Sequence, residues 1–225
     1  ERVGLAASGS RVYVTWVTQT KVARYSGTAP RVLYVRTNTN HGASTSWKTA
    51  IRLTGTTGRV DYPTIAATGS DVHVAWTDAV AGTIKVATSR NAGTTWTTRS
   101  IGTATTLTTD GRNGVPSVAA FGATVAVVWI ADPAGTIKGR VSLDHGATWG
   151  PLETVGVTPL GFASVAVRGN RIAVAWSTLD DVVVRLRVAG TWGAPMAIAS
   201  LAPGGDPVPY APMIVLQDPD RIGVA

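Results

Sequence analysis

The chain contains no cysteine, so disulfide bonds and Cys-ligated metal sites are excluded. Glutamate is nearly absent, with only Glu1 and Glu153, so a pair of catalytic carboxylates would have to come from aspartates. The three histidines are scattered, and no calcium loop with D-x-[DN]-x-[DN]-G spacing is present. No apolar run is long enough to span a bilayer. We therefore expect no metal, no cofactor and no membrane span.

The net charge is +7 at pH 7, and most of the basic residues are arginines spread along the chain. No three of them are consecutive, whereas a nucleic-acid groove needs clustered basic residues with interleaved aromatics. The charge predicts a general attraction to polyanions such as an acidic polysaccharide, and no nucleic-acid partner. A composition rich in Thr and poor in Lys and Glu favours an exported, extracellular or cell-surface protein.

Tryptophan occurs in four pairs that divide the chain into similar units. The pairs are Trp16/Trp47, Trp76/Trp96, Trp129/Trp149 and Trp176/Trp192. Each unit contains an apolar stretch, a tight turn, an alternating run that ends in Trp, a loop, and a further run before the second Trp. A repeat of about 50 residues built of strands and turns predicts stacked sheets such as propeller blades.

Alternation within these runs predicts strands that are buried on both faces. Val72, Val74 and Trp76 share one face, and His73 and Ala75 share the other, which carries no strong charge. In the second unit we expect strands at 63–67, 71–77, 83–89 and 96–102, and in the third at 116–120, 124–130, 136–142 and 149–155. The fold class is all-β, a β-propeller of four-stranded antiparallel blades.

The whole chain, 1–225, is predicted to form one propeller domain that is incomplete. The blades are expected at about 1–54, 62–102, 115–156 and 162–200, with the start of another at 211–225. The final run, Ile222 to Ala225, stops one residue before the Trp that the repeat calls for. We therefore expect about four and a half blades of a longer ring of about five to seven.

The turn before the second Trp of each pair carries the sharpest motif. Residues 142–149 match S-x-D-x-G-x-T-W in full, and residues 89–96 match with Asn91 in place of Asp. The phrase closely resembles the Asp-box, or bacterial neuraminidase repeat, of sialidase-like β-propellers. An Asx side chain caps a tight turn, Gly allows positive φ, and Trp covers the turn. We predict this structural role for Ser89, Asn91, Gly93, Trp96, Ser142, Asp144, Gly146 and Trp149.

The longer loops all lie at the opposite ends of the strands, where blade-to-blade connections enter the innermost strands. Loops on a rigid scaffold carry function, and a mixture of Tyr, Arg and Asp suits a sugar ligand. We predict a ligand site facing the central axis, formed by Arg59, Asp61, Tyr62, Asp110, Arg112, Asn113, Asp206 and Tyr210. Asp78, Asp132 and Asp180 recur after strand-ending Trp residues, which favours a turn-initiating role.

The resemblance does not by itself imply sialidase activity. A sialidase would need an arginine triad, a Tyr polarised by a Glu, an Asp acid/base and an early Arg-Ile-Pro segment, and no Arg-Ile-Pro is present. We assign no catalytic residue to this segment. Three hypotheses stay open: a non-catalytic propeller that binds carbohydrate or cell-surface material, an exo-glycosidase with key residues elsewhere, and a docking module that binds other extracellular subunits.

Overall fold

The computed structural model describes residues 3–19, 30–103, 114–158, 162–200, 212–218 and 221–225. Their regular structure is a series of antiparallel strands and one short 3-10 turn, Ser44–Ser46. The first sheet has the order β1-β2-β3-β4 and the second β5-β6-β7-β8. Their strands are β1 (Val3–Ser8), β2 (Arg11–Gln19), β3 (Arg31–Asn38), β4 (Ile51–Arg52), β5 (Val60–Thr68), β6 (Asp71–Asp78), β7 (Thr83–Ser89) and β8 (Thr97–Thr103).

The third and fourth sheets repeat this arrangement, and a two-stranded sheet follows. In the fourth sheet two short segments, β16 and β17, both pair with β15 and share the place of a single outer strand. The strands are β9 (Ser117–Phe121), β10 (Thr124–Ile130), β11 (Thr136–Ser142), β12 (Glu153–Val157), β13 (Ala163–Arg168), β14 (Arg171–Ser177), β15 (Asp181–Val188), β16 (Thr191–Trp192), β17 (Met196–Ser200), β18 (Ile214–Asp218) and β19 (Arg221–Val224).

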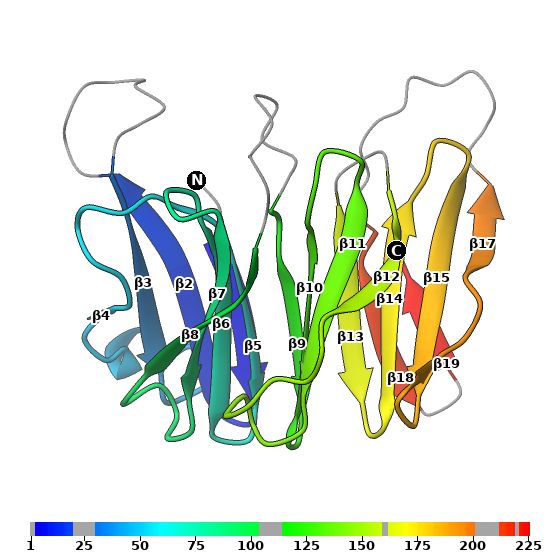
Figure 1. Cartoon of the computed structure of the whole chain (residues 1–225). Helices are drawn as coiled ribbons and strands as arrows, with labels where there is room; N and C mark the ends of the chain where they lie inside the picture. Colours follow the sequence, from blue (N-terminus) through cyan, green and yellow to red (C-terminus); the bar gives the residue numbers. More distant parts are fainter. Residues whose placement is uncertain (1–2, 20–29, 104–113, 159–161, 201–211, 219–220) are drawn as a thin grey trace.

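Successive sheets follow one another in chain order, from blue to red in Figure 1. The first strand of each sheet contacts the first strand of the next, from β1 through β5, β9 and β13 to β18. These first strands therefore form the inner layer, and the later strands of each sheet lie progressively farther out. This is the blade arrangement of a propeller, so the predicted all-β fold class is confirmed, and each sheet is called a blade below.

The core lies between blades, because the large side chain at the end of each second strand packs against the preceding blade. Trp76 packs with Val17 and Leu33 of the first blade. Trp129 packs with Val86 and Ile101 of the second. These indoles are almost completely buried, at 1% and 0% exposed. The strand side chains point alternately to the two faces of a blade, and both faces are apolar because each inner blade packs against a neighbour on both sides.

The observed strands match the expected ones in most places, and the differences have local causes. β5 begins at Val60 rather than at residue 63, because the register shifts between Asp61 and Thr64 and lets Val60 pair with Asp78. β12 begins at Glu153 rather than at residue 149. Pro151 lies in the gap and has no N–H to donate to the β11 ladder.

Candidate functional site

The two ends of the blades carry different kinds of connection. Turns between first and second strands and the Asp-box turns 38–47, 89–96 and 142–149 lie at one end, named here the Asp-box rim. Connections between second and third strands, and between blades, lie at the other end, named here the loop rim. The predicted ligand residues Arg59, Asp61 and Tyr62 lie at the loop rim. The other predicted ligand residues, Asp110, Arg112, Asn113, Asp206 and Tyr210, lie outside the described residues.

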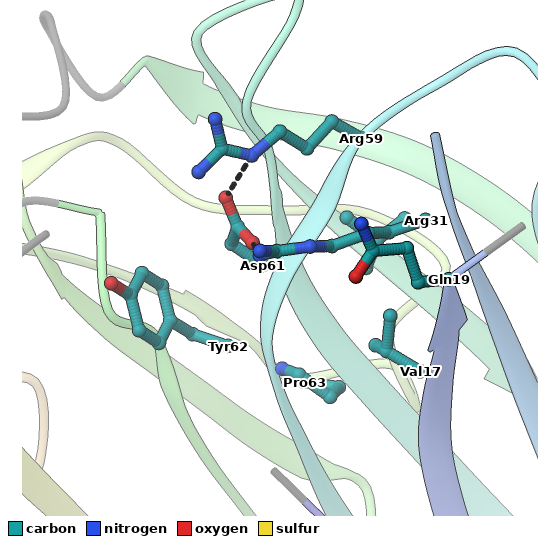
Figure 2. A pocket seen from close by; sticks show the side chains of 8 residues that line it. Val17, Gln19, Arg31, Arg59, Asp61, Tyr62 and Pro63 are labelled. Carbon is teal, nitrogen blue, oxygen red and sulfur yellow. Dashed lines mark hydrogen bonds and ion pairs between the residues drawn. The ribbon is translucent and has the colours of Figure 1, made fainter. Parts of the chain in front are cut away.

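A pocket of ≈ 390 Å³ opens at the loop rim between the first and second blades. Figure 2 shows its lining side chains, which come from the end of β2, the start of β3, and the start of β5 with the residue before it. The lining residues are Val17, Gln19, Arg31, Arg59, Val60, Asp61, Tyr62 and Pro63. Three of the eight predicted ligand residues are therefore brought together here.

Asp61 is the electrostatic centre of this pocket. Its side chain is 5% exposed and forms ion pairs with the Arg31 guanidinium and with Nε of Arg59, the latter at 2.9 Å. The two guanidinium groups approach the carboxylate from different strand ends (Figure 2). A buried carboxylate is tolerated only when it is paired, and two partners leave this cluster with one net positive charge.

Sequence reasoning missed Arg31 and Gln19 as pocket residues. Arg31 begins β3 and Gln19 ends β2, so the two residues flank one loop and pair directly across the ladder. A polar pair at the point where two adjacent strands meet a long loop is the signal that could have identified them. The ion pair with Asp61, thirty residues away, depends on the packing of the first blade against the second.

Tyr62 has an unusual backbone that places it beside Asp61. Its φ is 55°, in the left-handed region that bulky residues rarely adopt. It lies at the register shift of β5, directly before Pro63. Such backbone conformations cost about 1–3 kcal/mol each and cluster at ligand sites, as β-bulges also do.

The described lining of this pocket combines one carboxylate with guanidinium, amide and phenol groups. Asp61 is the sole carboxylate among the described residues that line it, and two guanidinium groups hold that carboxylate. Ordinary glycoside hydrolysis uses two carboxyl groups on either side of the scissile bond. Guanidinium, amide and phenol groups instead provide directional hydrogen bonds to hydroxyl or acidic groups of a ligand.

At the Asp-box rim, the turn at 142–149 is held by its own side chains. The Oδ1 atom of Asp144 accepts hydrogen bonds from the Ser142 hydroxyl at 2.7 Å and from the Thr148 amide at 2.8 Å, and Oδ2 accepts one from the Thr148 hydroxyl at 2.6 Å. The Gly146 amide donates to Ser142 Oγ at 2.8 Å. These bonds, with those from Thr148 first, hold the pKa of Asp144 well below its usual range.

The turn at 89–96 repeats this geometry with an amide in place of the carboxylate. Asn91 Oδ1 accepts from the Ser89 hydroxyl at 3.0 Å and from the Thr95 amide at 2.9 Å. The Gly93 amide donates to Ser89 Oγ at 2.9 Å, and Trp96 Nε1 donates to the Gly93 carbonyl at 3.0 Å. Trp96 and Trp149 are half-buried beside these turns rather than fully buried. The bonds are those that a turn-capping role requires.

The Asp-box turn of the third blade also contacts the second blade. His145 lies against Asp71 of β6, and its Nδ1 pairs with the Asp71 carboxylate. Gly146 lies over the completely buried His73, whose Nδ1 is 3.1 Å from the Thr88 hydroxyl. Burial lowers the pKa of His73 to about 4. The turn therefore joins two blades as well as two strands.

Two of the three recurring aspartates begin turns at the loop rim. Asp78 Oδ1 accepts hydrogen bonds from the Val80 and Ala81 amides, and Asp132 Oδ1 accepts one from the Thr136 amide at 3.0 Å. In the fourth blade the expectation for Asp180 was wrong. There the turn is capped by Thr178, whose Oγ1 accepts a hydrogen bond from the Asp181 amide at 2.9 Å. A hydroxyl can replace a carboxylate in this kind of turn.

The described residues contain no group of three or more His, Cys, Asp and Glu side chains that could hold a metal ion. No helix in the described part of the chain is long and apolar enough to cross a membrane.

Comparison with solved structures shows a sialidase-like β-propeller fold. A Hadza microbial sialidase, Hz136, aligns with a TM-score of 0.65 at 12% identity, over 99% of this chain and 49% of its own. Trypanosoma rangeli sialidase aligns with a TM-score of 0.59 at 15% identity, over 99% and 42%. NanB sialidase from Streptococcus pneumoniae aligns with a TM-score of 0.54 at 16% identity, over 89% and 35%.

The chain thus spans half or less of the length of these structures. No family model and no curated protein sequence matches the chain. At these identities the likeness defines the fold, and the protein is a propeller of the sialidase type in its architecture.

Proposed function

We propose that this propeller segment binds carbohydrate at the loop-rim pocket and does not itself hydrolyse it. The observation that carries the proposal is the Arg31–Asp61–Arg59 cluster in the wall of a ≈ 390 Å³ hollow. A hollow of this size falls within the range of about 300–1,000 Å³ that small-molecule sites occupy. Tyr62 and Gln19 complete a lining that offers an aromatic face and amide groups.

The charge of the cluster indicates which sugars would be preferred. Two guanidinium groups and one carboxylate leave one positive charge, and Asp61 fixes the positions of both arginines. Fixed guanidinium groups recognise carboxylate and sulfate oxygens by paired hydrogen bonds, with little loss of side-chain entropy on binding. We propose an acidic saccharide as the ligand and an exported, cell-surface setting for the protein.

A glycan panel followed by calorimetric titration tests this proposal. We expect binding of at least one acidic oligosaccharide, weakened about tenfold or more by Arg59→Gln or by Tyr62→Gly. Glycine is chosen for Tyr62 because it adopts the observed φ of 55° without strain. The matched control is Arg52→Gln, which removes the same charge from an exposed position of β4.

Three outcomes would contradict the proposal. Unchanged affinity in both pocket variants would place the ligand elsewhere on the molecule. Release of a sugar from the bound oligosaccharide, lost in Asp61→Asn, would show that the described pocket catalyses hydrolysis and would favour the exo-glycosidase hypothesis. Binding of a protein partner that neither pocket variant weakens, with no glycan bound, would favour a docking module.

A further inference from the structure

We infer that a second binding site, for the anionic groups of an acidic polysaccharide, lies between the second and third blades at the Asp-box rim. It is separate from the loop-rim pocket, which lies at the opposite end of the strands between the first and second blades. The site consists of two hollows of ≈ 240 Å³ and ≈ 540 Å³. Arg99 and Ala147 line both of them, so the hollows form one groove, named here the seam groove.

Uncompensated positive charge is the first argument for an anionic ligand. Arg90 and Arg99 both line the smaller hollow, and both side chains are exposed. The carboxylates closest in the fold are already engaged: Asp71 pairs with His145, and Asp144 is bound by Ser142 and Thr148 of its own turn. Among the described residues, no carboxylate lines either hollow.

The next seam shows what a neutralised arrangement looks like in the same protein. There Arg187 of the fourth blade pairs with Glu153 of the third at 2.9 Å, and Glu153 also accepts a hydrogen bond from Trp192 Nε1 at 2.6 Å. The arginine at that seam holds two blades together. The two arginines of the seam groove have no such protein partner in the described part of the chain, so their charge is available to a ligand.

The other groups in the seam groove suit a sugar chain. Hydroxyl groups from β7, from β8 and from the Asp-box turns of the second and third blades line the groove, and Trp149 forms part of the wall of the larger hollow. Hydroxyls exchange hydrogen bonds with sugar hydroxyls in either direction, and an indole offers an apolar face to the C–H side of a sugar ring. His145 also lines the smaller hollow, with Nδ1 committed to Asp71. The hydroxyl residues are Thr88, Thr95, Thr97, Thr98, Ser100 and Thr148.

A polysaccharide fits these residues better than a nucleic acid does. Proteins that bind single-stranded nucleic acid use several aromatic side chains on which successive bases stack. Among the described residues that line the seam groove, Trp149 is the one indole or phenyl side chain, and half of the lining residues carry hydroxyls. The geometry therefore assigns sulfate or carboxylate groups of a sugar chain to Arg90 and Arg99.

The test separates a site from a general attraction to the +7 chain. One variant carries Arg90→Gln and Arg99→Gln. The control carries Arg11→Gln and Arg52→Gln, two exposed arginines of the first blade, and each double variant lowers the net charge from +7 to +5 because two arginines are removed. Titrations use a heparin tetrasaccharide and an oligogalacturonate at about 0.15 M salt, where long-range charge effects are largely screened.

We expect the seam-groove variant to weaken binding about tenfold or more and the control to change it less than about twofold. Loss for heparin alone assigns sulfate esters, and loss for the oligogalacturonate alone assigns carboxylates. Equal weakening by both double variants, or no weakening, would overturn the inference. So would tighter binding of a single-stranded oligonucleotide of equal charge.

A pocket variant distinguishes this inference from the proposed function. Tyr62→Gly lies at the loop rim and should leave seam-groove binding unchanged, whereas it should weaken binding at the loop-rim pocket about tenfold or more. If Tyr62→Gly removes all binding of both probes, the seam groove is not a site. If only the seam-groove variant loses binding, the inference holds and the loop-rim proposal fails.

Discussion

A Gly→Ala substitution within a strand usually stabilises a protein, but the contact between successive blades predicts that Gly102→Ala destabilises this one. Gly102 lies in β8 of the second blade, and the Trp129 indole of the third blade packs on its backbone. A Cβ at this position would lie 2.3 Å from Cζ2 and 2.8 Å from Cη2 of Trp129. The indole has no room to move away from an added methyl group, because Trp129 is completely buried and its Nε1 donates to the Thr103 carbonyl at 3.1 Å.

The expected magnitude follows from two opposing effects. Replacing glycine with alanine within a strand normally stabilises by about 0.5–1 kcal/mol. Forcing a methyl group into a filled interface costs about 1–3 kcal/mol. We expect Gly102→Ala to lower the free energy of unfolding by about 1–2 kcal/mol, which corresponds to a fall in Tm of about 2–8 °C for a chain of this length.

Chemical denaturation followed by circular dichroism, together with calorimetry, measures this difference. The control is Gly223→Ala in β19, where no atom lies within 4 Å of the added Cβ. We expect the control to be unchanged or slightly more stable. A double-mutant cycle with Trp129→Phe isolates the contact, since the cost of the methyl group should shrink when the indole is smaller. Equal stability of Gly102→Ala and Gly223→Ala would refute the proposed packing between blades.

Three further predictions concern electrostatic contacts. Burial lowers the pKa of His73 to about 4, so the unfolded chain, with a His pKa of about 6.5, binds the proton first. The free energy of unfolding of the unmodified chain should therefore fall, relative to that of His73→Gln, by up to about 3 kcal/mol as pH is lowered from about 6.5 to about 4. Denaturation measured across this pH range tests this, and an equal change with pH in both proteins would contradict it. Glu153→Ala should destabilise by about 2 kcal/mol, because it leaves Arg187 and Trp192 Nε1 without their shared acceptor, whereas Glu153→Gln should cost less. Asp144→Ala should lower Tm at neutral pH. The pKa of Asp144 is depressed in the folded state, so the difference in Tm between the two proteins should vanish in acid, where the carboxylate is protonated. A difference in Tm that stays constant down to low pH would contradict the capping role.

The residues that hold the Asp-box turns differ from those that line the proposed binding sites, and this difference decides what each variant should change. Asp144 and Asn91 are engaged within their turns at one rim, and Arg31, Arg59 and Asp61 surround a hollow at the other. The seam groove lies at the Asp-box rim but uses arginines that the turns themselves do not need. Variants of the turns should therefore change stability, and variants of the loop-rim pocket and of the seam groove should change binding.

Repetition in the sequence was sufficient to predict the fold, because strand periodicity and turn chemistry act over a few residues. Val72, Val74 and Trp76 alternate, and Gly69 sits at a turn, wherever the blades later pack. The strands β6, β7, β10 and β11 lie within one residue of their predicted places for this reason. The ends of β5 and β12 were less predictable, since a register shift and the Pro151 segment depend on pairing with a neighbouring strand.

Only the tertiary structure could decide which charged residues meet. Arg31 and Asp61 belong to different blades, as do Asp71 and His145, and nothing in the local sequence of either pair indicates its partner. The same holds for Arg90 and Arg99, whose seam groove exists only because the third blade packs beside the second. Short-range patterns determine strands and turns, whereas a site requires side chains from separate blades to converge, and that depends on the angle and distance at which the blades pack.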